Sequence, residues 1–373
     1  MSQQINKIRI GITQGDINGV GLEVIVKTLA NNDILDLFTP VVFADPDILM
    51  GVVEGLKLQD FTFETIEDTG QIADGVINVL PVKAEASGHK PGKPSMEAGR
   101  AAVEALEAAS KAIEAGEIDL LVTAPIDKHS AQGEGFRFAG HTEYLEDRFA
   151  VEGGKALMIL ADEGLRVSLV TTHISLADVP RHITRSSVGE AIRNFSRALK
   201  MDFGCERPKI AVLSLNPHCG DGGVIGNEEE KEIIPAIEDC RKEGIMAFGP
   251  IAADGLFGSG AYRNFDGVLA MYHDQGLAPF KALASGGGVN FTAGLNIVRT
   301  SPAHGTAYDK AGRGLADETS MRQALYAAID IARRRDAFLD ASENPLEIRP
   351  VVQKGPKRQK GAAETDDVVP QED

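Results

Sequence analysis

The chain has 373 residues, of which 43% are hydrophobic and 25% are charged, and its formal net charge is −17. A chain of this length is expected to form two domains and to bury a large core without disulfides. The acidic balance argues against binding to nucleic acid or to an anionic membrane surface. An anionic ligand would therefore need cations within its own site.

The cysteines and the N-terminal residues indicate the cellular compartment in which the protein is expected. Cys205, Cys219 and Cys240 show no CxxC spacing, which argues for a reducing environment and against a thiolate metal site. The first residues, MSQQINKIRI, contain no apolar segment typical of a signal peptide. No apolar run reaches the ~18 residues that a membrane span requires. We expect a cytoplasmic protein without membrane contact.

Apolar runs alternate with helical patterns along the chain. The predicted strands cover residues 7–13, 39–45, 118–125, 155–162, 166–173, 209–218, 267–273 and 296–300, and the clearest helices cover 95–116, 227–244 and 316–340. Several of the apolar runs are continuous rather than alternating, which is typical of parallel strands that are buried on both faces. The pattern predicts an α/β protein with a largely parallel sheet.

The last part of the chain differs in composition. From about residue 343 it combines few apolar residues with four prolines and blocks of charge, which predicts a disordered or loosely attached tail. A basic patch at 354–360 could bind an acidic partner, but a solvated tail is the favoured interpretation.

Three of the predicted strands end in a histidine: His173, His218 and His273. Ligands bind at the carboxyl ends of the strands in an open parallel sheet, so these imidazoles could meet and hold Zn²⁺ or Co²⁺. The alternative, that each histidine only bonds to a loop, stays open at this point. Asp274 could orient the neighbouring imidazole, bind the metal, accept a proton or simply pair with a cation.

Other polar residues lie near the same predicted sheet edge. Lys281, Asn290 and Arg299 could clamp a phosphate or carboxylate, although each alone is more often a surface residue. His141 and Thr142 stand at the start of a helix, where Thr142 could simply be a cap. The glycine-rich segment 215–229 could hold an anion or form a mobile loop.

The usual nucleotide fingerprints are absent from the sequence. No GxGxxG follows the first strand, KPGKPS is not a P-loop, and there is no GxSxG. However, HGTAYDKAGRG (304–314) resembles the loop that holds the adenosine end of NAD(P) in the isocitrate and isopropylmalate dehydrogenases. Together with GHTEYL, VTTHISL, LNPHCGDGG, AMYHDQGLAPFK and GVNFTAGLNIVRT, it makes the chain, from about residue 7 to 340, similar to the 4-hydroxythreonine-4-phosphate dehydrogenases of vitamin B6 biosynthesis.

This resemblance implies two α/β domains separated by a cleft, as in the isocitrate and isopropylmalate dehydrogenases. The first domain would comprise 1–138 and 300–342, and the second, 139–299, would carry most metal and substrate residues. The resemblance also implies a homodimer whose active sites are shared across the interface. One departure is TQGDINGVG, where the family commonly has prolines at the positions of Gln14 and Ile17.

The family pattern implies a role for each candidate residue. His173, His218 and His273 would bind one divalent ion (Zn²⁺, Co²⁺ or Mg²⁺), with one of the three supplied by the partner subunit, and Asp274 would be the proton acceptor. The substrate would contact His141, Thr142, Lys281, Asn290 and Arg299. NAD or NADP would contact His304, Gly305, Thr306, Ala307 and Gly312.

The implied reaction oxidises the secondary alcohol of 4-phosphooxy-L-threonine to 2-amino-3-oxo-4-phosphooxybutanoate, which loses CO₂ to give 3-amino-2-oxopropyl phosphate. Two enzymatic alternatives remain at this stage. One is a related dehydrogenase of threonate or erythronate 4-phosphate, and the other is a phosphate acyltransferase with a similar two-domain fold. A non-enzymatic binding protein is a weaker alternative, because it has no need of three histidines beside a dinucleotide loop.

Overall fold

The computed structural model describes residues 7–82, 89–132, 136–151, 154–284 and 287–344. Within these ranges twelve strands form one sheet in the order β3-β4-β2-β1-β5-β12-β11-β6-β7-β10-β8-β9. The strands are β1 (Arg9–Thr13), β2 (Thr39–Ala44), β3 (Glu64–Thr65), β4 (Asn78–Pro81), β5 (Leu120–Thr123), β6 (Leu157–Asp162), β7 (Leu165–Leu169), β8 (Lys209–Leu213), β9 (Met246–Ile251), β10 (Gly267–Ala270), β11 (Val289–Ala293) and β12 (Val298–Pro302).

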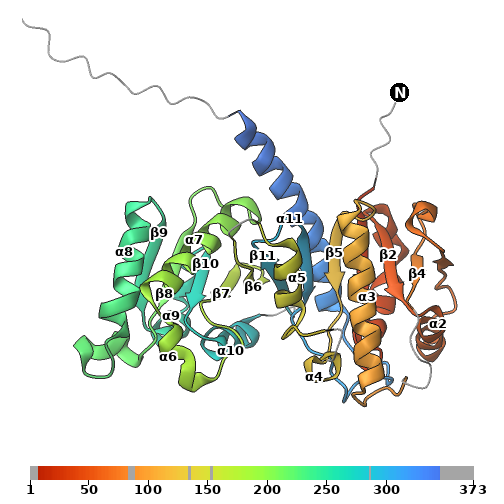
Figure 1. The fold of residues 1–373 in the computed structure, drawn as a ribbon, viewed down its shortest axis with the longest axis horizontal. Coiled ribbons are helices and arrows are strands. Elements are labelled where there is room, and N and C mark those ends of the chain that lie inside the picture. The colour runs from red at the N-terminus through yellow and green to blue at the C-terminus, as the bar shows by residue number, and fades with distance from the viewer. Residues whose placement is uncertain (1–6, 83–88, 133–135, 152–153, 285–286, 345–373) are drawn as a thin grey trace, which may run out of the picture.

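Helices cover both faces of this sheet. They are α1 (Gly21–Leu29), α2 (Pro46–Gly55), α3 (Met96–Glu114), α4 (Lys128–Ala131), α5 (His141–Phe149), α6 (Val179–His182), α7 (Arg185–Met201), α8 (Ile234–Lys242), α9 (Ala253–Gly258), α10 (His273–Leu283) and α11 (Thr319–Glu343). Figure 1 shows two lobes, one containing α2, α3 and β2 and the other α7, α8 and β9, with α11 between them.

Strand β2 illustrates why both faces are buried. Val41 and Phe43 belong to a hydrophobic cluster that includes Leu106 of α3, whereas Val42 belongs to a cluster that includes Ile25 of α1. Successive side chains of a strand point to opposite faces, so a continuous apolar run packs against a helix layer on each side. The predicted α/β class is confirmed as a three-layer arrangement.

The expected parallel pairing holds toward both ends of the sheet but not at its centre. Strand β11 runs antiparallel to both β12 and β6, and β6 runs antiparallel to β7. The sequence reasoning missed β3, β4, β9 and β11. Gly249 and Pro250 interrupt β9, and β11 is a short run inside a glycine-rich stretch, so neither gives a clear strand pattern.

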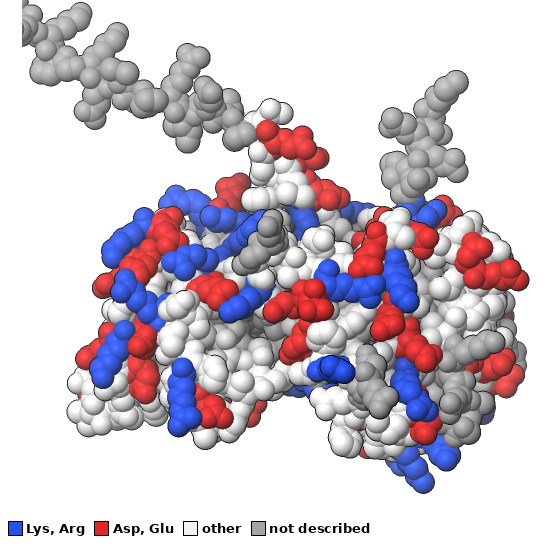
Figure 2. All heavy atoms as spheres, in the orientation of Figure 1, with Lys and Arg blue, Asp and Glu red and all other residues white. Residues whose placement is uncertain are grey.

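The predicted division into domains, 1–138 with 300–342 and 139–299, remains a prediction, because one sheet runs through both lobes. Residues 345–373, which hold most of the predicted tail and its basic patch, lie outside the described residues. In the part of the chain that the structure describes, no helix is long and apolar enough to cross a membrane. On the face drawn in Figure 2, acidic and basic side chains are interspersed.

Candidate active site

The three candidate metal histidines follow neighbouring parallel strands. Strand β10 pairs in parallel with β7 on one side and with β8 on the other. The strands end at Leu169, Leu213 and Ala270, so the prediction that they end on the histidines themselves is wrong. His173 and His218 lie in the loops that follow, and His273 is the first residue of α10. All three still come after strands that share one edge of the sheet.

His173 and His273 lie close together, with their ring centroids 6.0 Å apart. Asp274 Oδ1 lies 2.7 Å from Nδ1 of His273, and Glu143 Oε1 lies 3.5 Å from Nδ1 of His173. A carboxylate at Nδ1 fixes the tautomer that leaves Nε2 available as a metal ligand. At present Nε2 of His173 lies 2.9 Å from the Lys128 ammonium.

His218 belongs to an exposed turn after β8. Among the described residues no three His, Cys, Asp or Glu side chains are grouped closely enough to hold a metal ion. The chemistry of His173 and His273 nevertheless fits part of a divalent site, because two imidazoles with carboxylates at Nδ1 are typical of such sites.

A cavity of about 180 Å³, here called the central cavity, collects most of the candidate substrate residues. Its lining includes His141, Thr142, His173, Asn290, Arg299, His304 and Gly305, together with Thr123, Lys128, Glu143 and Ser301. Four buried atoms of this lining have no hydrogen-bond partner: Nε2 of His141, Oε2 of Glu143, Oδ1 of Asn290 and Nε2 of His304. Buried polar atoms are normally paired, so this concentration indicates the place of a polar ligand.

Arg299 places a positive charge inside the protein beside this cavity. Its side chain is 2% exposed, and it donates to the hydroxyls of Thr123 and Thr292 at 3.1 and 3.0 Å. No carboxylate in the described ranges forms an ion pair with it. Burial lowers the pKa of Arg299 to about 10, so it stays charged at neutral pH and can attract an anion.

The same environment leaves the His141 ring uncharged. Burial, followed by the positive charges of Arg299 and Lys128, lowers the pKa of His141 well below its ordinary value. The ring is therefore neutral at neutral pH and can donate or accept one hydrogen bond through Nε2. The hydrogen bond with His173 lowers the pKa of Glu143, which keeps that neighbour ionised.

Two hydrogen bonds join the proposed nucleotide loop to the loop between β1 and α1. Thr306 accepts a backbone hydrogen bond from Val20 at 2.9 Å, and the Tyr308 hydroxyl donates to Asp16 at 2.7 Å. A second cavity, of about 290 Å³, is lined by Val20, His304, Ala307, Lys310, Ala316, Asp317 and residues at the start of α11. A third, of about 210 Å³, is lined in part by Gly312.

Some candidate residues do not line the central cavity. Lys281 is exposed on α10, and Asp274 lines a separate cavity of about 450 Å³ with Asn216, Asp254 and Tyr272. The sequence reasoning also missed Lys128 and Glu143. Lys128 follows β5, so the argument from strand ends could have found it. Glu143 lies in the first turn of α5, where an acidic residue is common and gives no separate signal.

The fold and the site define an α/β protein that receives a small polar ligand beside a buried positive charge. The chain belongs to the family of the pyridoxal phosphate biosynthetic protein PdxA, whose model matches residues 36–328.

Relatives of known name and structure agree with this assignment. A 4-hydroxythreonine-4-phosphate dehydrogenase from Bacteroides thetaiotaomicron is 53% identical over 345 residues, covering 91% of this chain and 93% of the relative. A relative from Oceanobacillus iheyensis, 39% identical over 87% of this chain and 97% of its own length, is provisionally named D-threonate 4-phosphate dehydrogenase. The crystal structure of a 4-hydroxythreonine-4-phosphate dehydrogenase from Klebsiella pneumoniae matches with a TM-score of 0.73 and 33% identity, covering 89% of this chain and 99% of that one.

Proposed function

We propose that this chain is a dehydrogenase that oxidises 4-phosphooxy-L-threonine to 2-amino-3-oxo-4-phosphooxybutanoate, which then decarboxylates to 3-amino-2-oxopropyl phosphate. Family membership and the name of the Bacteroides relative support the reaction. The observation that carries the proposal for the site is the set of four partnerless buried atoms around the central cavity, next to the buried guanidinium of Arg299.

We assign substrate binding to His141, Thr142, Asn290 and Arg299. Arg299 attracts an anionic group, and the neutral His141 ring and the Asn290 amide offer hydrogen bonds that fix its orientation. Each of these groups is already desolvated by the protein, so pairing with the substrate would relieve the cost of burial. Lys281, exposed on α10, would complete the clamp in a homodimer, where it can face the cavity of the second copy.

We assign one divalent ion, Zn²⁺, Co²⁺ or Mg²⁺, to His173 and His273 of one copy and His218 of a second copy. Such an ion would supply Lewis-acid chemistry at the substrate alcohol and at the ketone. Asp274, at Nδ1 of His273, orients that ring. Its side chain is 85% exposed, and it is our candidate for the proton acceptor.

We assign the nucleotide, NAD or NADP, to the loop that includes His304, Gly305, Thr306, Ala307 and Gly312. Bound there, the oxidised nicotinamide would accept the hydride. Support comes from the cavity of about 290 Å³ between this loop and the start of α11. His304 lines both this cavity and the central cavity, so nucleotide and substrate would meet at its ring.

The test is a turnover assay with 4-phosphooxy-L-threonine, each nucleotide and a series of divalent ions, followed by the absorbance of the reduced nicotinamide. Turnover that stops with a chelator and returns on adding metal is expected. No reduced nicotinamide with either nucleotide and any of the ions would contradict the proposal.

A histidine replacement tests the metal assignment. His218→Ala should reduce Co²⁺ affinity by more than about 100-fold, beyond the loss typical of a group that only orients a ligand, and abolish turnover, because one of three ligands is lost. Its circular dichroism spectrum should match that of the wild type, because His218 is exposed. Full activity of a metal-free His218→Ala protein would contradict the assignment.

The name of the Oceanobacillus relative favours D-threonate 4-phosphate as a second candidate substrate. D-threonate 4-phosphate lacks the amino group of 4-phosphooxy-L-threonine. The anionic groups are the same, so the same anion-binding residues would serve both compounds. A comparison of kcat/KM for the two substrates decides between them, because this ratio measures discrimination in the transition state.

A further inference from the structure

The turn that carries His218 has an unusual backbone. Five consecutive residues have left-handed dihedral angles: His218 (φ 52, ψ 28), Cys219 (φ 55, ψ 36), Gly220 (φ 80, ψ −5), Asp221 (φ 47, ψ 54) and Gly222 (φ 60, ψ 29). Three of them are not glycine, and L-residues with a side chain disfavour this region because Cβ approaches the following carbonyl. Such a conformation persists only where the surroundings enforce it, and it is found mainly at functional sites.

The carboxylate of Glu229 is the group that holds the base of this turn. Glu229 is 1% exposed, and its Oε1 accepts from the backbone N–H groups of Leu215 and Asn216 at 2.8 and 2.7 Å. Its Oε2 accepts from the Asn216 side-chain amide at 2.9 Å. Both oxygens of one buried carboxylate are thus used by the segment that leads into His218.

The same carboxylate packs directly beneath the turn. A Cβ atom added to Gly220 would lie 2.8 Å from Oε2 of Glu229 and 2.6 Å from the carbonyl oxygen of Gly226. The left-handed path therefore passes over the carboxylate with no room for a side chain at Gly220.

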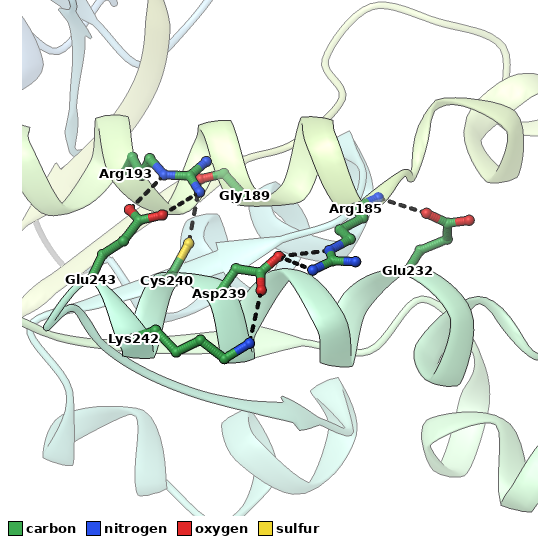
Figure 3. Close-up of polar contacts among 8 residues, drawn as sticks. All are labelled: Arg185, Gly189, Arg193, Glu232, Asp239, Cys240, Lys242 and Glu243. Atoms are coloured by element: carbon green, nitrogen blue, oxygen red, sulfur yellow. Dashed lines mark hydrogen bonds and ion pairs between the residues drawn. The ribbon is translucent and has the colours of Figure 1, made fainter.

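Glu229 belongs to a segment that is held to α7 by ion pairs and hydrogen bonds. It opens a π-helical turn, Glu229–Ile233, that continues into α8. Figure 3 shows α8 tied to α7 by Arg193 with Glu243, at 2.7 Å for both bonds, and by Arg185 with Asp239 at 2.6 Å. The backbone N–H of Arg185 also donates to Glu232, inside the π-helical turn, at 2.6 Å. π-helical turns commonly occur at functional sites, where they shift one side chain out of the regular helical register.

We propose that Glu229 is a positioning residue for His218, holding the left-handed turn in the shape that presents this imidazole to a metal shared with a second copy. The proposal rests on the proposed function for the role of His218 as a ligand. Glu229 acts through the backbone of Leu215 and Asn216 and does not touch the metal.

The main variant is Glu229→Gln, which keeps the size of the side chain but replaces one acceptor oxygen by a donor. The matched control is Glu230→Gln, which changes an exposed glutamate one residue further along. The first measurement is pulse alkylation of the metal-free protein, read by mass spectrometry of the peptide that carries Cys219. Cys219 lies in the turn, half-buried, with Sγ 3.6 Å from the Pro250 carbonyl, and the buried Cys240 is an internal reference.

We expect Glu229→Gln to raise the alkylation rate of Cys219 severalfold and leave Cys240 unchanged, because the turn loses its fixed shape. Co²⁺ affinity, measured by titration of its visible absorption, should fall about 10- to 100-fold, as for other groups that orient a ligand. Glu230→Gln should match the wild type in both measurements, and Glu229→Asp should lie between.

A double variant separates positioning from general stability. In a His218→Ala background, Glu229→Gln should still raise Cys219 alkylation but cause no further loss of Co²⁺ affinity, because both changes act on one ligand.

If His218→Ala alone binds Co²⁺ like the wild type, the metal assignment fails, and the alkylation of Cys219 still decides whether Glu229 holds the turn. A folded Glu229→Gln protein with unchanged Cys219 alkylation and unchanged Co²⁺ affinity would overturn the proposal. If Glu229→Gln does not fold, Asn216→Ala removes the side-chain hydrogen bonds to Glu228 and Glu229 but keeps the backbone ones, and it should shift both measurements in the same direction by a smaller amount.

Discussion

At the scale of single residues, the central cavity depends on two buried nitrogen-containing side chains with different charge states. Arg299 keeps its charge because its pKa, although lowered by burial to about 10, is still far above neutral pH. His141 loses its charge because burial and the two neighbouring cations disfavour the protonated ring. The cavity thus offers one fixed cation and one neutral hydrogen-bonding ring, a combination that suits a substrate carrying both an anionic group and a hydroxyl.

The lowered pKa of His141 predicts how stability depends on pH. The folded chain binds this proton less readily than the unfolded chain, so the stabilisation is fully present above the unfolded pKa of about 6.5 and is lost as the pH falls toward the folded pKa. Replacing His141 by Gln removes this contribution, which is at most about 1.4 kcal/mol per pH unit. The Tm of the variant should therefore fall less than that of the wild type between about pH 7.5 and 5.5. Parallel Tm curves for the two proteins would contradict the prediction.

At the scale of elements, helix α1 forms hydrogen bonds with the C-terminal end of the proposed nucleotide loop. The Lys27 ammonium donates to the carbonyl oxygens of Gly314 and Ala316 at 2.9 and 2.6 Å. Oε1 of Glu23, one turn earlier, accepts from Lys27 at 2.9 Å and from the Ala316 backbone at 2.8 Å. Because Glu23 is buried and Lys27 is largely so, this i,i+4 pair holds the loop more firmly than an exposed pair would.

Lys27→Met should weaken nucleotide binding without changing the chemical step. The loss of charged hydrogen bonds, worth roughly 1.5 kcal/mol, should raise KM for the nucleotide about tenfold and leave kcat at saturation within about twofold. The matched control is Arg334→Met, which breaks an exposed i,i+4 pair with Asp330 on α11. A large fall in kcat with no change in KM would show that the hydrogen bonds of Lys27 do not act on nucleotide binding.

At the scale of the whole molecule, the described part of one chain does not bring the three candidate metal histidines together. His173 and His273 face each other across 6.0 Å, whereas His218 stands on an exposed turn whose neighbours Val224 and Ile225 are 82% and 47% exposed. An apolar patch of this kind beside a ligand residue favours contact with another protein surface. A symmetric dimer would place the turn of each copy at the cavity of the other.

Subunit mixing tests this shared site. His173→Ala and His218→Ala proteins should each be inactive alone. After joint unfolding and refolding in equal amounts, about half of the dimers are mixed and each mixed dimer has one intact site, so about a quarter of the wild-type activity should return. Mixing His173→Ala with a His173→Ala/His218→Ala protein is the control and should restore none. No recovery in a mixture shown to contain mixed dimers would exclude a site shared in this way.

Much of the fold follows from local patterns. The continuous apolar runs around β1, β2, β5 and β10 and the helix α3 are encoded by short-range preferences. Ser95 caps α3 by accepting a hydrogen bond from the backbone N–H of Ala98. The motif around residues 304–314 and the histidines after parallel strands could also be found in the sequence, because residue type and spacing alone carry these signals.

Other features depend on contacts between distant segments. The antiparallel direction of β6 and β11 is set by pairing between strands that are distant in the sequence, which a periodic pattern does not encode. The burial of Arg299, the contact of Lys128 with His173 and the hydrogen bond from Leu215 to Glu229 all depend on residues from different elements. The sequence by itself determined the fold class, the family and which residue types are available for chemistry. Only the tertiary structure decided which of them share a cavity and which charge state they adopt, because both depend on burial and on neighbours brought together by folding.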